Sequence, residues 1–227
     1  MEYKIFGEDL PAVSVRLKQG ESIYTQSGGM AWMDAGITMN TNMKGGLMKG
    51  IGRMFSGESL FMATYTASKP NSEIVFASTF PGKILALEVD HTKEYICQKS
   101  AFLCGTQGID LGVEFTKRFS AGAFGGEGFI LQRISGQGTV FLEAAGSVVK
   151  RELAPGEVVK VDTGNVVGFE RGVGYEVEMV KGFKNVLFGG EGLFLTKLIG
   201  PGTIWLQTIT MQNFAGRIAP FIPTSGN

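Results

Sequence analysis

Three glutamates occupy equivalent places in a short phrase that the chain repeats, and they are the side chains with the clearest capacity for chemistry. Glu58, Glu127 and Glu191 each lie three residues after a phenylalanine and directly after a glycine. Carboxylate oxygens suit Ca²⁺ or Mg²⁺, so three glutamates meeting near a pseudo-threefold axis would form a cation site. Alternatively, each carboxylate accepts N–H bonds from its own glycine turn and holds the bend. Converging carboxylates repel one another without an ion, so we expect the local role and predict no metal site.

The other reactive residue types do not assemble a catalytic site. A catalytic triad needs an imidazole or an equivalent base beside its nucleophile. The single histidine, His91, lies in a turn-like stretch, where we expect it at the surface. The glycines at 125, 126 and 128 lack the Lys and Ser/Thr of a phosphate-binding loop. We therefore predict no catalytic residue, no cofactor and no enzymatic activity.

The two cysteines have a structural interpretation. Cys97 and Cys104 lie in apolar surroundings, seven residues apart, a spacing that matches no zinc pattern. We interpret them as two buried free thiols of a cytoplasmic protein. A disulfide or a shared metal is the alternative.

The repeated phrase belongs to a larger repeat. Its three copies begin 69 and 64 residues apart, and the last two match at 10 of 19 positions over residues 124–142 and 188–206. A second phrase recurs upstream, around Glu21, Glu94 and Glu157. A near-constant period indicates one structural unit built three times. We predict a single domain, 1–227, with three internal repeats and a C-terminal tail, at about 14–80, 81–147, 148–211 and 213–227.

Within each unit the pattern is that of β-strands. Short apolar runs flank Gly136-Gln137-Gly138, which predicts a tight hairpin. The chain holds 34 glycines in 227 residues, about twice ordinary usage, which indicates many turns between short strands. Further strands are expected at 148–153, 158–161, 166–170 and 175–180. The sequence predicts an all-β fold of three antiparallel units, arranged as a barrel or sandwich, with very little helix.

A basic and apolar segment precedes each copy of the phrase. The first, 44–55, has the spacing of one helical stripe, weakened by four glycines; the later ones are 115–119 and 181–187. These segments pack against the barrel end, form a subunit interface or lie on a membrane surface, and the sequence leaves all three open. For contact with another subunit or partner we select four residues: Met48, Arg53, Met54 and Phe55.

Composition narrows the functional class. Twenty-one basic and 21 acidic residues cancel, so no overall charge attracts the chain to nucleic acid. No apolar run approaches the ~20 residues that span a bilayer. Residues 1–9 have neither a basic start nor an apolar core typical of a secretory leader. We expect a cytoplasmic protein.

The repeated motifs resemble a known family. They include 27–33, 57–61, 111–113, 124–129 and 136–140, and they are similar in order and type to an uncharacterised bacterial family related to the proteins of altered inheritance of mitochondria. This resemblance implies a fold like that of the tryptophan RNA-binding attenuator protein, related to a double-stranded β-helix. It also implies a symmetric homo-oligomer, with a trimer favoured. It supplies no catalytic residues, and neither tryptophan nor RNA binding is carried over.

We therefore predict a non-enzymatic, homo-oligomeric binding or scaffolding protein. One alternative is a small-ligand-binding or enzymatic barrel, which would need an interior pocket lined by polar groups such as Gln26, Thr64 or Gln132. A second alternative is a peripheral membrane organiser. The protein partner is not identified by the sequence.

Overall fold

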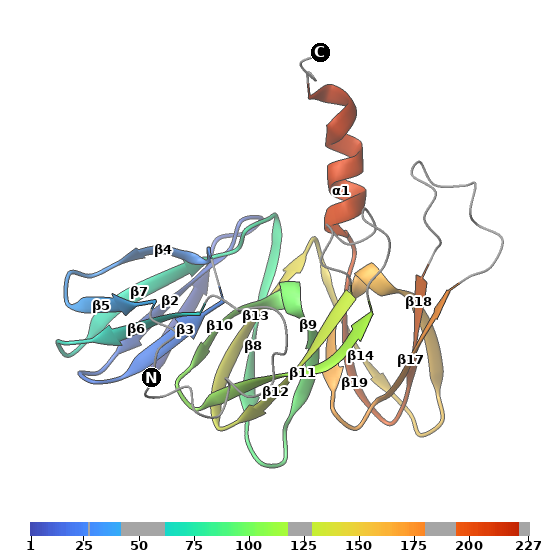
Figure 1. The fold of residues 1–227 in the computed structure, drawn as a ribbon, viewed down its shortest axis with the longest axis horizontal. Helices are drawn as coiled ribbons and strands as arrows, with labels where there is room; N and C mark the ends of the chain where they lie inside the picture. Colours follow the sequence, from blue (N-terminus) through green and yellow to red (C-terminus); the bar gives the residue numbers. More distant parts are fainter. Residues whose placement is uncertain (27, 42–61, 118–128, 180–193, 223–227) are drawn as a thin grey trace.

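Strands dominate the computed structural model, which describes residues 1–26, 28–41, 62–117, 129–179 and 194–222 (Figure 1). The all-β prediction is confirmed, with one short α-helix in the described residues. The first strand, β1 (Glu2–Phe6), precedes the repeated pattern of strands. The remaining strands fall into three consecutive sets of six, which we name units 1, 2 and 3.

The three units have these strands. Unit 1 contains β2 (Ala12–Leu17), β3 (Ser22–Thr25), β4 (Met30–Met33), β5 (Ile37–Asn40), β6 (Ala63–Ala67) and β7 (Ser72–Ala77). Unit 2 contains β8 (Gly82–Val89), β9 (Tyr95–Gln98), β10 (Phe102–Thr106), β11 (Ile109–Lys117), β12 (Phe129–Gly136) and β13 (Gly138–Ala145). Unit 3 contains β14 (Val148–Leu153), β15 (Val158–Asp162), β16 (Val166–Glu170), β17 (Gly174–Met179), β18 (Phe194–Ile199) and β19 (Gly202–Gln207).

Each unit has the same antiparallel pairing. Its first and third strands flank the sixth, and its second and fourth strands flank the fifth. The third strand carries an irregularity at the same point in every unit, between Met30 and Trp32, between Phe102 and Cys104, and between Val166 and Gly168. Such a bulge bends a strand and re-aims its side chains.

The units are joined through their second and third strands. β3 of unit 1 pairs with β10 of unit 2, and β9 of unit 2 pairs with β16 of unit 3. These junctions create two six-stranded sheets, in the orders β5-β6-β3-β10-β13-β8 and β11-β12-β9-β16-β19-β14. A four-stranded sheet, β1-β2-β7-β4, lies at one end, and a three-stranded sheet, β15-β18-β17, at the other. The units therefore stand in a row (Figure 1).

The hydrophobic cores cross the unit boundaries. Tyr24 of unit 1 stacks on Phe102 of unit 2, with ring centroids 5.7 Å apart, in the core of unit 2. Ile96 of unit 2 lies in the core of unit 3 together with Phe169. Burying one such side chain stabilises the fold by roughly 1.5–3 kcal/mol, so the junctions are as much a part of the core as the units themselves.

The tight turn expected at 136–138 is present, but the expected hairpin is wrong, because the strands on either side of the turn, β12 and β13, belong to different six-stranded sheets. β12 ends at Gly136 and β13 begins at Gly138, and both glycines have positive φ, +99° and +151°. A Cβ at Gly136 would lie 2.1 Å from the carbonyl oxygen of Gly108. Glycine is therefore required both by the backbone conformation and by the close approach of a neighbouring turn.

One equivalence drawn from the sequence is wrong. The strand registers place Lys93, rather than Glu94, level with Glu21 and Glu157. Glu21 and Glu157 each accept an N–H bond, from Lys18 and Ala154, across the turn between the first two strands. In unit 2 that turn is held by Asp90, whose carboxylate accepts from the N–H of Thr92 at 2.7 Å. Glu94 does not hold this turn, and its carboxylate instead accepts from Arg171 of unit 3.

A buried glutamate fastens the connection between units 1 and 2. Glu143 on β13 accepts from the backbone N–H of Thr79 and the hydroxyl of Ser78, both at 2.9 Å. At the same place in unit 3, Gln207 accepts from the N–H of Ala145 at 2.9 Å. Burial raises the pKa of Glu143, and its hydrogen bonds oppose that rise.

This contact predicts a difference between two substitutions. Glu143→Ala removes the acceptor of a part-buried N–H, so we expect a loss of roughly 2 kcal/mol in the free energy of unfolding, measured by urea titration. Glu143→Gln keeps an acceptor, as Gln207 does, and we expect a smaller loss at neutral pH.

The pH dependence supplies the control. A carboxyl whose pKa is raised by folding costs stability as pH rises from the unfolded pKa through the folded one. The Gln variant lacks this cost, so its stability relative to the parent should improve between about pH 4 and pH 7. A relative decline over that range would contradict the assignment.

Candidate functional site

The residues selected from the sequence lie outside the described residues. Glu58, Glu127 and Glu191 fall in 42–61, 118–128 and 180–193, and the contact residues Met48, Arg53, Met54 and Phe55 fall in the first of these stretches. In chain order, each stretch connects the fourth and fifth strands of its unit. Their roles stay predictions.

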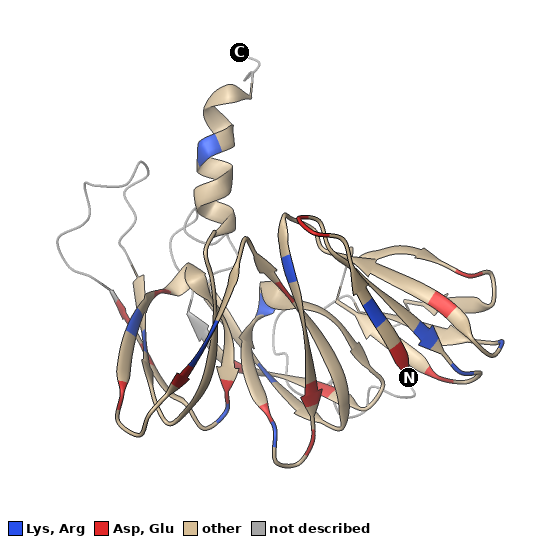
Figure 2. Cartoon of the chain, turned by 180° about the vertical axis from the view of Figure 1, so that it is seen from behind, with Lys and Arg blue, Asp and Glu red and all other residues tan. Residues whose placement is uncertain are grey.

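Within the described ranges, His, Cys, Asp and Glu do not gather into a group of three or more that would hold a metal ion. The helices described are also too short, or too polar, to cross a membrane. Acidic and basic side chains are spread over the strands, with neither sign gathered on the face drawn in Figure 2.

The expected turn histidine borders a hollow where units 2 and 3 meet. Pairing of β9 with β16 brings residues 91–95 beside residues 170–172, and the space between them has a volume of about 440 Å³. His91 is exposed in its turn, as the sequence predicted. The hollow is therefore a product of the junction between units.

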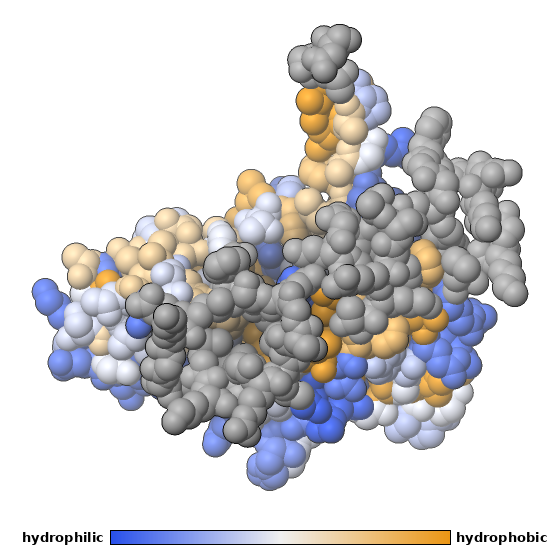
Figure 3. Space-filling model, in the orientation of Figure 1, coloured by the Kyte–Doolittle hydropathy of each residue, from blue (hydrophilic) through white to orange (hydrophobic). Residues whose placement is uncertain are grey.

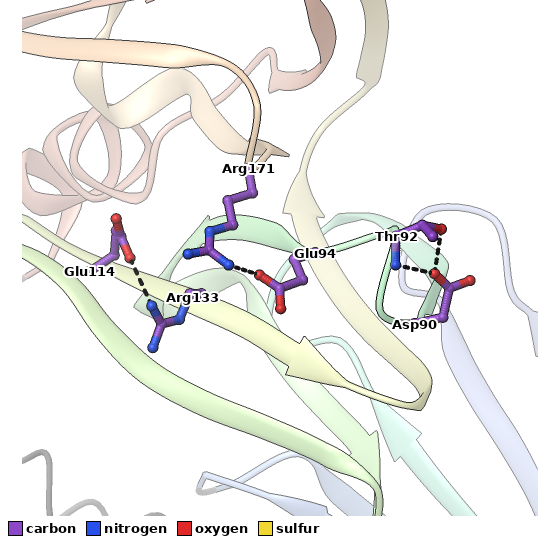
Figure 4. Close-up of polar contacts among 6 residues, drawn as sticks. All are labelled: Asp90, Thr92, Glu94, Glu114, Arg133 and Arg171. Atoms are coloured by element: carbon purple, nitrogen blue, oxygen red, sulfur yellow. Dashed lines mark hydrogen bonds and ion pairs between the residues drawn. The ribbon is translucent and has the colours of Figure 1, made fainter.

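An ion pair across the junction lines this hollow (Figure 4). The guanidinium of Arg171 donates to the carboxylate of Glu94, and the backbone N–H of Arg171 donates to the Glu94 carbonyl at 3.0 Å. Glu170 accepts from the N–H of Thr203 at 2.9 Å. Both carboxylates are thus engaged in holding strands and turns.

The strongly perturbed groups are enclosed in the cores. Both cysteines are buried and free, which confirms this part of the interpretation from the sequence. Burial raises the pKa of Cys97 to about 12. Burial, with a smaller contribution from the charge of Glu143, raises the pKa of Cys104. The pKa of Tyr24 is raised by burial, and its hydroxyl donates to the Ile109 carbonyl at 2.7 Å.

The polar residues proposed for an interior pocket do not line the hollow. Gln26 follows β3, Thr64 lies on β6 and Gln132 lies on β12. Gln132 is fully buried, and its amide atoms have no hydrogen-bond partner among the described residues. On either side it faces Cys97 and Val113 of paired strands. The surroundings are those of a packed sheet.

A helix that the sequence analysis missed projects from unit 3. α1 (Met211–Ile218) begins after Thr210, whose hydroxyl accepts from the N–H of Asn213 at 3.1 Å, and none of its residues is buried. One side of α1 is apolar (Figure 3). The spacing of this stripe and the Thr210 cap were the available signals. Its exposed members in α1 are Met211, Phe214 and Ile218, and the exposed Phe221 and Ile222 follow the helix.

Comparisons with known proteins agree on one family. The family described as mitochondrial biogenesis AIM24 matches residues 3–209. An uncharacterised protein of Streptococcus pyogenes serotype M6 is 33% identical over 225 residues, which are 96% of this chain and 89% of that protein. The crystal structure of a Streptococcus pyogenes protein is similar, with a TM-score of 0.78 and 29% identity, over 97% of this chain and 99% of that one.

The buried thiols predict low reactivity. A thiolate is the nucleophile in disulfide exchange, and burial holds Cys97 and Cys104 in the thiol form. We expect the native protein at pH 8 to show almost no reaction with Ellman's reagent over minutes, and two thiols per chain to react after guanidinium unfolding. Rapid labelling of the folded protein would contradict this account.

Proposed function

The chain belongs to the mitochondrial biogenesis AIM24 family, and we propose that it acts without catalysis, as a homo-oligomeric binding or scaffolding protein. The observation that carries this proposal is α1, an amphipathic helix of 8 residues, none of them buried. Isolated helices of this length are marginal in water. An exposed apolar stripe on such a helix marks a surface that is covered by a partner.

A role without catalysis is supported by where the perturbed groups lie. Three groups with raised pKa values are buried and held by packing or hydrogen bonds, namely Cys97, Cys104 and Glu143. Catalytic groups need a cleft that admits substrate. The junction hollow is open, yet its carboxylates are already engaged.

The proposal also includes the oligomeric state of the protein and its location in the cell. We favour a trimer, because the family resemblance described for the repeated motifs implies a symmetric homo-oligomer. The free thiols Cys97 and Cys104 suit the reducing cytoplasm. The partner bound by the assembly is a protein.

Mass in solution tests the assembly. Light scattering coupled to gel filtration should give about 73 kDa, three times the 24.3 kDa of one chain, at tens of micromolar. The same value on threefold dilution would show a stable assembly. A mass of one chain throughout would contradict the proposal.

A second candidate function, a peripheral membrane organiser, is favoured by the same helix. The α1 stripe and the single basic residue of the helix, Arg217, match a helix that lies in a membrane interface. Under this alternative the protein co-floats with anionic vesicles. Ile218→Asp abolishes flotation by placing a charge in the stripe, and Asn213→Asp on the polar side leaves it unchanged. Equal behaviour of the two variants, or no flotation of the parent, removes this candidate.

A further inference from the structure

We infer that β15 of one chain pairs with β4 of a second copy, in the register that the chain already uses twice to join its own units. This inference rests on the proposed homo-oligomer and names the surfaces that form it. Each chain would contribute β4 to a contact at the unit 1 end and β15 to a contact at the unit 3 end.

The two internal junctions are the same structure. At the first, Gly105 faces Tyr24. At the second, Phe169 faces Ile96. Gly105 and Phe169 occupy the same position of the third strand, judged by their partners on the sixth strand. Tyr24 and Ile96 likewise share a position of the second strand. The register between units is therefore repeated without a shift.

At the two ends of the row of units, the strands that would form such a junction, β4 and β15, each have an open edge. β4 is the third strand of unit 1 and β15 the second strand of unit 3, and within the described part of the chain each has a neighbour on one side only. By contrast, the first and fourth strands lie at sheet edges in units 2 and 3 alike, as β8, β11, β14 and β17 do. An open edge at β4 or β15 is thus specific to the chain ends.

Burial distinguishes the end strands from their internal counterparts. Every residue of β9 is buried, and β10 and β16 are buried in four of five residues. β4 has no fully buried residue, and β15 has one. Trp32 is 52% exposed, although its counterpart Cys104 is fully buried in the core of unit 1. An exposed strand edge flanked by apolar side chains is a template for another strand.

The repeated register fixes the contact. By the same equivalence, Trp32 of the second copy faces Val161, Met33 faces Lys160, and Asp34 faces Val159. The carbonyl of Glu94 accepts from the N–H of Arg171 at the second junction. Antiparallel pairs alternate between bonded and non-bonded, so Asp34 and Val159 form a non-bonded pair, the type with the closest side chains.

The side chains fit this arrangement. Trp32 opposite Val161 is an aromatic and β-branched pair, which favours strand association. Lys160 stands where the internal strands have apolar Tyr24 and Ile96. Its ammonium lies 3.5 Å from the Glu178 carboxylate within its own sheet, so its aliphatic stem remains to cover Met33 of the second copy.

The contact is head-to-tail. One surface belongs to unit 1 and the other to unit 3, so the interface is heterologous and generates a closed ring when the rotation permits. A trimer of this kind uses both ends of every chain. A symmetric dimer through β4 against β4, or β15 against β15, is the competing arrangement.

Disulfide trapping distinguishes these arrangements. Asp34→Cys and Val159→Cys are made separately, and the native cysteines stay silent because they are buried. Under mild oxidation each single variant should remain uncrosslinked, and an unfolded and refolded mixture of the two should give covalent dimers. The double variant should give covalent trimers. Thr38→Cys on β5, mixed with Val159→Cys, is the matched control and should give none.

The outcomes separate this inference from the proposed function. An oligomer by light scattering without crosslinking of the Asp34 and Val159 pair overturns the strand contact and leaves the oligomer standing. Crosslinking of either single variant with itself assigns a symmetric interface and also overturns it. A monomeric parent removes both proposals together.

A charge on β4 provides an independent readout. Trp32→Lys should reduce the mass in solution from three chains to one, with unchanged circular dichroism, because this side chain is exposed in the single chain. Val149→Lys replaces an apolar residue of similar exposure, 48%, on the edge strand β14 and should leave the mass unchanged. Retention of the full mass by Trp32→Lys contradicts the proposed contact.

Discussion

The ladder between the second strand of one unit and the third strand of the next is the interaction on which this architecture depends. Each unit alone consists of two three-stranded sheets, which are near the lower limit for a stable sheet. The junctions convert them into six-stranded sheets and place Tyr24 and Ile96 in the core of the following unit. A unit therefore completes its core with a strand from its neighbour.

The junction also fixes register, because side chains alternate between faces of a strand. Tyr24 points into the core of unit 2, and its neighbour on β3, Ile23, lies in the core of unit 1. A shift of one residue would exchange these faces and remove the hydrogen bond from the Tyr24 hydroxyl to Ile109. Glu143 and Gln207 hold the connecting segments at the matching position of each sixth strand. The hydrogen bonds of Tyr24, Glu143 and Gln207 thus specify the register of the strands, and the buried apolar side chains stabilise it.

Local patterns in the sequence predicted the strands but not how the units join. The runs at 148–153 and 166–170 coincide with β14 and β16, because Gly, Pro and Asp bound short apolar segments there. Pairing between units joins residues about 80 positions apart, such as Tyr24 and Gly105, and leaves no periodic signal. The Glu94 equivalence failed because the turn in unit 2 is held by Asp90.

The functional prediction from the sequence was incomplete because it did not include α1. It concentrated on the repeated glutamates, which lie outside the described residues, and it overlooked α1. That helix has only two turns and contains Gly216, so its propensity is weak, and Pro220 follows closely. Its recognition depended on the spacing of Phe214 and Ile218 rather than on composition. The contact between Glu94 and Arg171 required the fold, since the two residues are brought together by β9 and β16.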